Sequence, residues 1–389
     1  MVANDGTDVA FEKPPPMCNE NGDKTRQVPK KPIKLNKKNE PPNLYNTIMD
    51  IITFLLVSAG HILQTFYYTM FGYPKKDLKG ELALITGGGG GLGRLLALRL
   101  VRLGVKVIIW DINQDAIDET CKIITSMGGY CKGYVVDISK REEVYKMADE
   151  IRNRIGDVTL LFNNAGVVSG RLLLDTPDHM IERSFNVNAI AHFWTVKAFL
   201  PAMIEKDHGH IITIASMAGH VGISKLVDYC ASKFAAVGFD ESLRLELEIL
   251  GCRNVHTTVI CPYFIQATGM FDDVHSRWVP TLDSNHVADR IISGVRKNHK
   301  CVIVPEYFRW MLIIKWVFPW PCNSGFLRRL VLDAAPQHHT ISPTLQKCES
   351  ALLAAASSSN GMTTVNNNGT AKPNQLLVQR TASTGERVL

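Results

Sequence analysis

The chain has 389 residues, of which 46% are hydrophobic and 21% are charged. This composition excludes a wholly disordered, collagenous or disulfide-stapled protein. The formal charge is +6, and the stretch from Lys24 to Asn39 holds seven basic residues and no acid. Because an apolar segment follows this basic stretch, we expect its partner to be an anionic lipid surface and not nucleic acid. A solvated arm without a partner is the alternative.

Both ends of the chain differ in composition from the middle. Residues 1–43 are rich in Pro, Lys and Asn, and residues 335–389 contain runs of Ala, Ser and Asn. Neither end can bury enough apolar surface to offset the entropy of ordering, so we predict a disordered basic arm and a low-complexity, disordered tail. The remaining length fits a single domain.

The 9 cysteines are scattered, and no two of them form a Cys-x-x-Cys pair. This spacing argues against both a disulfide framework and a zinc site, so the sequence predicts no metal. Reduced thiols of this kind are typical of a chain that faces the cytosol.

An apolar segment over residues 44–73 has aromatic residues at both ends. Its length suffices to cross a bilayer, which predicts a membrane-anchor helix. Polar residues at spacings of three to eight leave a partial polar stripe, so a helix lying in the membrane interface is a competing prediction. A buried core helix is the third alternative. The segment begins too far from Met1 and lacks a small-residue cleavage site, so we do not interpret it as a signal peptide.

Short apolar strands alternate with helix-like segments over residues 78–306. We expect strands at 82–86, 105–110, 134–136, 160–162, 211–214, 255–260 and 302–304. Continuous apolar strands separated by helices predict a parallel sheet that is covered on both faces. The expected fold class is therefore α/β, a single doubly wound sheet of the Rossmann type.

A glycine run closes the first expected strand and opens the first helix. Thr86, Gly87 and Gly91 lie in the turn, and Leu92 and Gly93 follow at the start of the helix. Bare backbone N–H groups and the positive end of a helix can bind a pyrophosphate, so we expect these residues to hold a dinucleotide. A flexible linker is the alternative.

Asp111 ends the second expected strand, 18 residues after Gly93. A carboxylate at this place accepts hydrogen bonds from the adenosine ribose and repels a 2′-phosphate, which favours NAD over NADP. The alternative is that Asp111 only starts the turn before Asn113. The basic residues Arg94 and Lys106 leave NADP open as the cofactor.

Tyr229 and Lys233 are four residues apart on an expected helix and therefore project from one face, and Ser216 follows a strand that can approach them. The pKa of an unperturbed tyrosine is near 10, which is about three units too high for a base at neutral pH. An adjacent lysine ammonium lowers this pKa and favours the phenolate. The sequence thus predicts a catalytic tyrosine.

These motifs resemble the short-chain dehydrogenase/reductase family over about residues 80–305. Residues 86–93 match Thr-Gly-x-x-x-Gly-x-Gly, and residues 163–166 match Asn-Asn-Ala-Gly. The resemblance implies that Tyr229 is the general acid/base, that Lys233 holds the cofactor ribose and tunes Tyr229, and that Ser216 orients the substrate oxygen.

The same resemblance implies further roles. Asn188 matches a helix residue that holds a relay water, Asp137 and Ile138 fall where the family contacts adenine, and Asn164 lines the adenosine side. One departure concerns the Pro-Gly after the sixth strand, which is here Pro262 followed by tyrosine, with Thr268 one residue late. We therefore expect a reshaped loop in which the backbone of Ile265 still contacts the nicotinamide carboxamide.

Within the family, residues 91–97, 110–113, 188–194 and 268–271 resemble the membrane-associated branch of epidermal retinol dehydrogenases and 17-beta-hydroxysteroid dehydrogenase 11-like enzymes. This branch acts on retinoids, steroids or other lipid alcohols, at the endoplasmic reticulum membrane or the lipid droplet. A second apolar segment, 307–334, is rich in tryptophan and predicts an interfacial helix or lid that contacts membrane lipids. A core helix or a homodimer contact is the alternative.

Together these features predict a membrane-associated oxidoreductase that uses NAD, with NADP as the alternative, and whose catalytic domain faces the cytosol. Its substrate is expected to be a retinol-like alcohol, oxidised to the aldehyde or ketone or formed in the reverse reaction. Two other functions stay open: a steroid-specific 17-beta-hydroxysteroid dehydrogenase, and a non-catalytic dinucleotide-binding scaffold on a membrane or lipid droplet.

Overall fold

The computed structural model describes residues 43–266, 270–271 and 274–334. The predicted disordered arm, apart from Asn43, and the predicted low-complexity tail lie outside these residues, as does Thr268.

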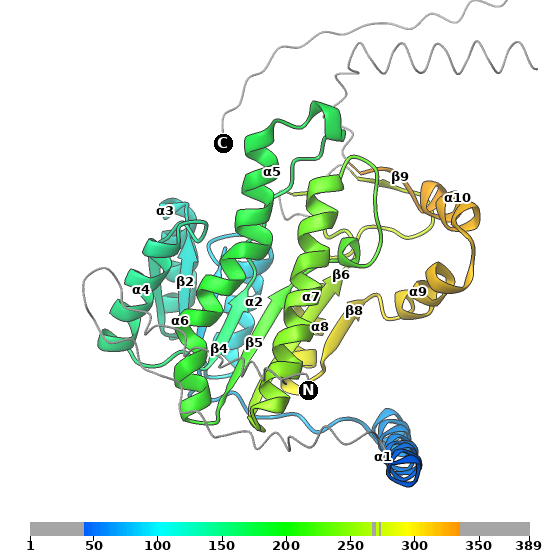
Figure 1. The fold of residues 1–389 in the computed structure, drawn as a ribbon. Helices are drawn as coiled ribbons and strands as arrows, with labels where there is room; N and C mark the ends of the chain where they lie inside the picture. The colour runs from blue at the N-terminus through cyan, green and yellow to red at the C-terminus, as the bar shows by residue number, and fades with distance from the viewer. Residues whose placement is uncertain (1–42, 267–269, 272–273, 335–389) are drawn as a thin grey trace, which may run out of the picture. The chain divides into compact units, whose positions relative to one another are not determined.

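A seven-stranded parallel sheet forms the centre of the described chain (Figure 1). Its order is β3-β2-β1-β4-β5-β6-β8, and every pair of neighbours is parallel. The strands are β1 (Leu82–Thr86), β2 (Lys106–Asp111), β3 (Cys131–Val135), β4 (Leu160–Asn163), β5 (Gly209–Ile214), β6 (Val255–Pro262) and β8 (Cys301–Val304). All seven expected strands are present, and the predicted doubly wound α/β fold is confirmed. The strand order reverses between β1 and β4, which is where such sheets bind ligands.

Two hydrophobic clusters cover the two faces of this sheet. Alternate residues of β1 point to opposite faces, so that Ala83 and Ile85 pack in one cluster and Leu82 and Leu84 in the other. The first cluster is completed by α2 (Gly91–Arg102), α3 (Gln114–Ser126) and α8 (Ser284–Arg296). The second is completed by α4 (Arg141–Arg154), α6 (Ala191–Glu205) and α7 (Val227–Ile249). Helices therefore lie on both faces, as the apolar strands predict.

Helix α5 (Asp178–Phe185) runs into α6 through a π-helical segment, η2 (Asn186–Ile190). Single π-helical turns within α-helices are uncommon and occur frequently at functional sites. Short 3₁₀ turns at Leu173–Asp175 and Met217–Gly219 complete this half of the domain.

Helix α1 (Leu44–Phe71) has an Asn43 cap, whose side chain accepts a hydrogen bond from the Tyr45 N–H. None of its residues is buried within the described part of the chain, so α1 is not a core helix. By length and composition, α1 and the continuous helix at residues 178–205 are the two helices of the described chain that could cross a membrane, which alone is weak evidence.

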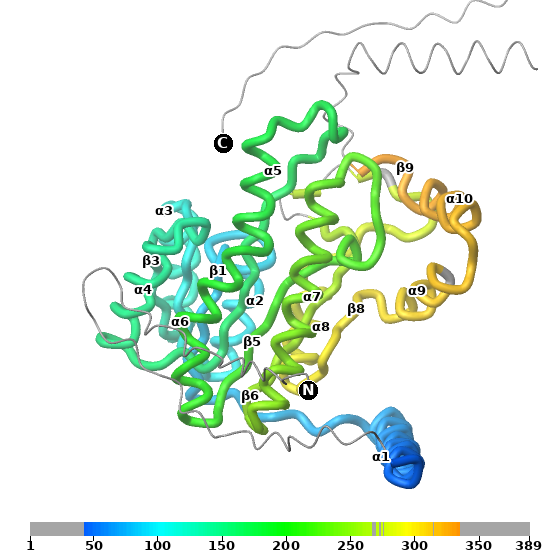
Figure 2. Tube along the Cα trace, in the orientation of Figure 1, coloured from blue at the N-terminus to red at the C-terminus, as the bar shows by residue number. Residues whose placement is uncertain are grey.

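After β8 the chain forms α9 (Phe308–Val317), α10 (Trp320–Leu330) and the short strand β9 (Val331–Asp333), a path that Figure 2 follows. Strand β9 pairs antiparallel with β7 (His275–Ser276). Phe308 is buried, whereas Trp310, Trp316 and Trp320 are 70–82% exposed. The segment 307–334 thus packs on the domain through residues such as Phe308 and Leu330, and presents its tryptophans outward.

Candidate active site

The carboxyl ends of the strands surround one cavity of about 640 Å³. Parallel strands end at the same edge of the sheet, so residues far apart in sequence meet there. Twelve of the predicted site residues line this cavity: Gly87, Gly91, Leu92, Gly93, Asp111, Asp137, Ile138, Asn164, Ser216, Tyr229, Lys233 and Ile265. The two other predicted residues, Thr86 and Asn188, are buried among the residues that support it.

The turn between β1 and α2 requires glycine at specific positions. A Cβ on Gly93 would lie 2.1 Å from the carbonyl oxygen of Gly87. Gly87 and Gly91 have φ angles of +62° and +49°, a region that side chains with a Cβ rarely adopt. The glycines therefore bring the backbone close to itself and leave the cavity wall bare, which fits a pyrophosphate at the start of α2.

Thr86 joins this turn to the end of β4. Its Oγ1 accepts hydrogen bonds from the N–H groups of Asn164 (3.0 Å) and Ala165 (3.1 Å). The Asn164 Nδ2 in turn donates to the carbonyl oxygens of Thr86 (2.9 Å) and Gly87 (3.0 Å). Thr86 thus supports the cavity wall that Asn164 and Gly87 form.

The carboxylate of Asp111 lies beside the glycine turn. Its Oδ2 accepts a hydrogen bond from the Gly89 N–H at 2.9 Å, and its Oδ1 accepts one from the Asn113 N–H at 3.1 Å. Asp111 therefore takes part in the turn before Asn113 and also lines the cavity, so the two readings of this residue are compatible.

Both basic residues that left NADP open have contacts of their own. The Arg94 guanidinium donates to the Gly89 carbonyl and pairs with Glu119 at 2.5 Å. Lys106 begins β2, at the opposite end of the strand from Asp111, and its Nζ lies 6.0 Å from the centre of the Tyr130 ring.

Asn188 occupies the π-helical segment η2 and has no exposed surface. Its Oδ1 accepts from the Val167 N–H at 2.8 Å, and its Nδ2 donates to the Val167 carbonyl at 2.9 Å and to Ser232 Oγ at 3.0 Å. A Cβ on Gly166 would lie 3.3 Å from Asn188 Oδ1 and 3.6 Å from Lys233 Nζ. The side chains of Asn188 and Lys233 therefore both approach Gly166.

Tyr229 and Lys233 lie one turn apart on α7 and are 5% and 3% exposed. The Lys233 ammonium lies 5.6 Å from the centre of the Tyr229 ring and donates to the Ile214 carbonyl at 2.9 Å. Ser216 Oγ accepts from the Ala218 N–H at 3.1 Å and donates to the Pro262 carbonyl at 3.4 Å. The three side chains line the same cavity, as predicted.

The electrostatics of this set differ from the expectation that Lys233 lowers the pKa of Tyr229. Burial raises the pKa of the Tyr229 phenol, and a hydrogen bond with Ser216 opposes this increase. Burial also lowers the pKa of Lys233 to about 8. Desolvation disfavours the charged form of both groups.

Two supporting residues were not identified from the sequence. Asp228, 4% exposed and directly before Tyr229, accepts hydrogen bonds from Ser169 Oγ (2.6 Å) and Ser184 Oγ (2.5 Å). Ser232 donates to the Tyr229 carbonyl at 2.8 Å. The bond from Ser184 joins the start of α7 to α5. An acidic residue in the first turn of the helix that bears the tyrosine was a usable signal for Asp228.

The cavity is apolar around Tyr229. The Phe271 ring meets the Tyr229 ring edge-on, with centroids 5.5 Å apart. The apolar lining residues here are Met217, Ile223, Leu226, Phe264, Met270 and Phe271. This end of the cavity suits a lipophilic molecule and excludes water from the tyrosine.

The loop after β6 accommodates the tyrosine that replaces the family's glycine. The Tyr263 hydroxyl bonds Ser276 Oγ at 2.8 Å, and its ring stacks on Phe308 with centroids 5.0 Å apart. Ile265 forms an isolated parallel bridge with Leu282 and lines the cavity. The expected reshaping of this loop thus takes the form of an aromatic contact with α9.

Comparison with known proteins decides the family. The family described as short chain dehydrogenase matches residues 81–277. The chain belongs to this family. It is therefore an oxidoreductase, and the predicted nicotinamide dinucleotide cofactor agrees with its glycine turn.

The curated relatives confirm the predicted branch of the short-chain dehydrogenases. The chain is 45% identical to short-chain dehydrogenase/reductase family 16C member 6 of Bos taurus, over 70% of this chain and 87% of that protein. It is 41% identical to epidermal retinol dehydrogenase 2 of Homo sapiens (69% and 88% covered). It is 40% identical to estradiol 17-beta-dehydrogenase 11 of Homo sapiens (70% and 90% covered).

Solved structures share the fold. A short-chain dehydrogenase/reductase from Burkholderia phymatum in complex with NAD has a TM-score of 0.56 at 24% identity, covering 62% of this chain and 94% of that one. The apo form of LigD from Sphingobium sp. strain SYK-6 has a TM-score of 0.54 at 28% identity, covering 62% and 100%.

Proposed function

We propose that this short-chain dehydrogenase is membrane-associated and uses NAD to oxidise a lipophilic alcohol of the retinol class, or catalyses the reverse reaction. One observation carries the proposal. Ser216, Tyr229 and Lys233 line the apolar end of a cavity whose other end is lined by the glycine turn and Asp111. The name of one relative, epidermal retinol dehydrogenase 2, supports the substrate class.

In this proposal each residue acts on a defined atom. Ser216 Oγ orients the substrate hydroxyl, and Tyr229 takes its proton. Because burial raises the pKa of the Tyr229 phenol, its ionisation would depend on the positive charge of Lys233 and on the charge that an oxidised nicotinamide would bring. The bound dinucleotide supplies the acceptor for the hydride. Lys233 Nζ and Asn188 lie around one point beside Gly166, which suits a relay that returns the proton from Tyr229 to solvent. The hydrophobic side chains that surround Tyr229 keep water away from the reacting atoms.

We assign NAD as the cofactor because of the charge beside the glycine turn. Asp111 places a carboxylate where the adenosine ribose is expected, and Arg94 is held by Gly89 and Glu119. Replacing Asp111 by Asn is expected to reduce the preference for NAD over NADP in kcat/KM about tenfold, equivalent to about 1.4 kcal/mol. An unchanged ratio would remove the support for NAD.

Membrane association rests on two exposed apolar surfaces. Helix α1 is 28 residues long and contains an 18-residue stretch with a mean hydropathy of 1.5, and α9 exposes Trp310 and Trp316. Exposed aromatic and apolar side chains of this density suit an interfacial or spanning anchor. The endoplasmic reticulum membrane or the lipid droplet is the proposed location, with the catalytic domain on the cytosolic side.

The test is turnover in membranes that carry the full chain, with all-trans-retinol and estradiol, each with NAD and with NADP. Tyr229→Phe should lower kcat by roughly 10² to 10⁴-fold, the usual contribution of general acid/base catalysis. Tyr145→Phe, a partly buried tyrosine on α4, is the matched control and should keep full activity.

A steroid-specific dehydrogenase is the second candidate, because other relatives carry the name estradiol 17-beta-dehydrogenase 11. It predicts turnover of estradiol in preference to retinol. If Tyr229→Phe leaves the turnover of every substrate unchanged, the tyrosine mechanism is wrong. If the wild-type chain turns over none of the substrates with either cofactor, a dinucleotide-binding scaffold becomes the better account.

A further inference from the structure

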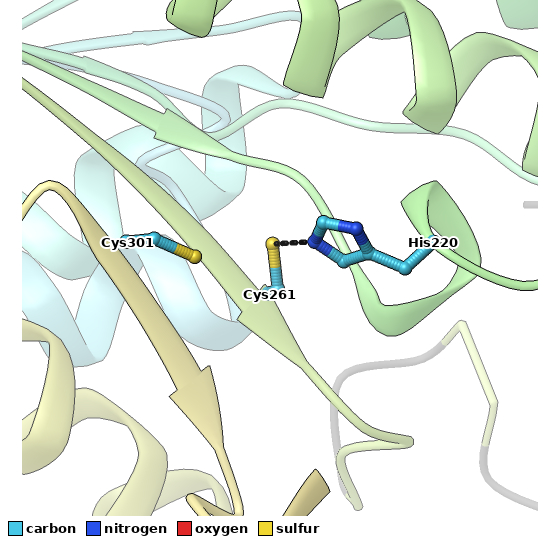
Figure 3. A group of neighbouring side chains, drawn as sticks. All are labelled: His220, Cys261 and Cys301. Atoms are coloured by element: carbon cyan, nitrogen blue, oxygen red, sulfur yellow. Dashed lines mark hydrogen bonds between the residues drawn. The ribbon is translucent and has the colours of Figure 1, made fainter. Parts of the chain in front are cut away.

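Three side chains that can bind metals meet beside strands β6 and β8, and the catalytic mechanism uses none of them. They are His220, which follows the 3₁₀ turn Met217–Gly219, Cys261 on β6 and Cys301 on β8. Their ligand atoms all lie within 4.8 Å of one another, and Cys261 Sγ is 3.4 Å from His220 Nε2. Figure 3 shows the His220 ring and the Cys301 thiol both directed at the Cys261 sulfur.

The sheet register explains why the two thiols share a face. Cys301 pairs with Val259, and Cys261 pairs with Ile303, in the parallel ladder between β6 and β8. Residues two apart in a strand point to the same face of the sheet, so Val259 and Cys261 share a face. Because Cys301 pairs with Val259, its thiol lies on that face as well. The expectation that the chain holds no metal rested on spacing along the sequence, and these ligands come from three separate segments.

The same register opposes a disulfide between these cysteines. With strands about 4.8 Å apart and a rise of about 3.3 Å per residue, two residues out of register put the Cα atoms roughly 8 Å apart. A disulfide cannot form beyond about 7 Å without backbone movement. A metal ion needs only the sulfur and nitrogen atoms to converge, as they do here.

The observed separations suit a tetrahedral ion. Zn–S bonds of about 2.3 Å and Zn–N bonds of about 2.0 Å put neighbouring ligand atoms roughly 3.5–3.8 Å apart. The 3.4 Å between Cys261 Sγ and His220 Nε2 is close to this spacing. Two thiols and one imidazole form a soft ligand set, which selects zinc-like ions over magnesium or calcium.

A buried carboxylate lies beside the cluster. Asp240 is near enough to interact with both thiols, and its Oδ1 is buried without a hydrogen-bond partner among the described residues. The negative charge of this carboxylate favours a cation beside it.

We propose that His220, Cys261 and Cys301 form a binding site for a thiophilic divalent cation of the Zn²⁺ type, with water as the fourth ligand. Cys261 is fully buried, whereas His220 and Cys301 are partly exposed, so the fourth position faces the accessible side of the cluster.

Such an ion would connect two functional parts of the enzyme. Cys261 interacts with the backbone N–H of Ser216, the residue that lines the cavity beside Tyr229. Lys315 of α9 donates to the His220 carbonyl at 2.6 Å, and Arg309 of α9 donates to the Cys301 carbonyl at 3.4 Å. Cation binding therefore stabilises both the Ser216 turn and the apolar helix α9, and it should raise the Tm of the protein.

The experiment uses the full chain in detergent micelles, dialysed against a chelator and titrated with Co²⁺, then with Zn²⁺. We expect one equivalent of Co²⁺ per chain, with a thiolate-to-cobalt charge-transfer absorption that Zn²⁺ abolishes by displacement. Loss of an outer-sphere partner already costs 10–100-fold in affinity, so Cys301→Ser and His220→Gln should each weaken Co²⁺ binding at least about 100-fold. Retained NAD binding in either variant shows that it is folded.

Cys121→Ser is the matched control, because Cys121 and Cys131 form a second close thiol pair, with sulfurs 3.0 Å apart, that lacks a histidine. It should leave Co²⁺ affinity unchanged. The proposal is overturned if the wild-type chain binds no stoichiometric Co²⁺, or if the absorption persists in both Cys301→Ser and His220→Gln. It is also overturned if mild oxidation joins Cys261 to Cys301 in a chain that binds no Co²⁺.

Discussion

Helix α1 and the continuous helix at residues 178–205 are both 28 residues long, and each contains an 18-residue apolar stretch, with mean hydropathies of 1.5 and 1.2. Of the apolar stretch in α1 none is buried, whereas 56% of the stretch in the second helix is buried inside the protein. Length and hydropathy therefore do not separate an anchor helix from a core helix. The partners of the polar side chains do separate the two kinds of helix.

In the buried helix the polar side chains bond other elements. Ser184 reaches Asp228, and Thr195 Oγ1 donates to Asn163 Oδ1 at 2.8 Å. In α1, Thr65 and Thr69 instead donate to carbonyls of their own helix, both at 2.8 Å. Polar groups in a core need partners from the rest of the fold, whereas a helix in lipid satisfies them within itself.

A charged residue placed in each helix should give the largest difference in the free energy of unfolding between the two helices. Val196 on α6 is 4% exposed, and Leu56 on α1 is 69% exposed. Val196→Asp buries an unpaired carboxylate and should lower the free energy of unfolding by about 4 kcal/mol or more. Leu56→Asp should change it by less than about 0.5 kcal/mol. Denaturant titration of both variants in micelles measures the difference, and equal losses would erase the distinction between the helices.

A histidine in the buried helix should make stability sensitive to acid. Burial, assisted by the charge of Lys233, lowers the pKa of His192 to about 3, and neither ring nitrogen has a partner among the described residues. The unfolded chain binds a proton at His192 near pH 6.5 and the folded chain does not. The contribution of neutral His192 to the free energy of unfolding is therefore complete above pH 6.5 and is lost as the pH falls toward 3.

At pH 5 the loss amounts to about 2 kcal/mol for His192. The wild-type chain should therefore lose about that much more stability between pH 8 and pH 5 than His192→Gln does. His61→Gln in α1 is the control and should follow the wild-type profile. Denaturant titration at the two pH values gives the comparison. Identical profiles for His192→Gln and the wild type would mean that His192 is not buried in its neutral form.

The sequence predicts those parts of the site that a local pattern encodes. The strand at 82–86, the glycine turn and the place of Asp111 at a strand end follow from apolar runs and backbone rules that operate over a few residues. Tyr229 and Lys233 on one helix face follow in the same way. A parallel sheet then brings these strand ends to one edge, which is why a local pattern sufficed to predict a shared cavity.

Features that depend on packing between distant segments were not predictable in this way. The cluster of His220, Cys261 and Cys301 depends on β8 lying beside β6, a register that no spacing encodes. The π-helical turn that holds Asn188, and the bonds of this side chain to Val167 and Ser232, join segments that are far apart in the sequence. The opposing effects of burial on Tyr229 and Lys233 likewise depend on how much protein surrounds them, which a motif does not specify.

Removal of α1 should have the smallest effect on the stability of the fold and a large effect on membrane binding. A chain that begins at Gly72 keeps the hydrogen bond from the Lys76 N–H to the Arg296 carbonyl (2.7 Å) and that between Lys76 Nζ and His210 (2.8 Å). Since α1 contributes no buried residue, the free energy of unfolding should change by less than about 0.5 kcal/mol.

The same truncated chain should move from the membrane pellet to the supernatant on sedimentation, in proportion to the apolar surface removed. A variant that keeps α1 but carries Trp310→Ala and Trp316→Ala is the control for the second apolar surface, and it should stay in the pellet. If instead the truncated chain sediments fully and the tryptophan variant does not, α9 is the anchor and α1 is dispensable, because the exposed tryptophans then supply the binding energy that we assign to α1.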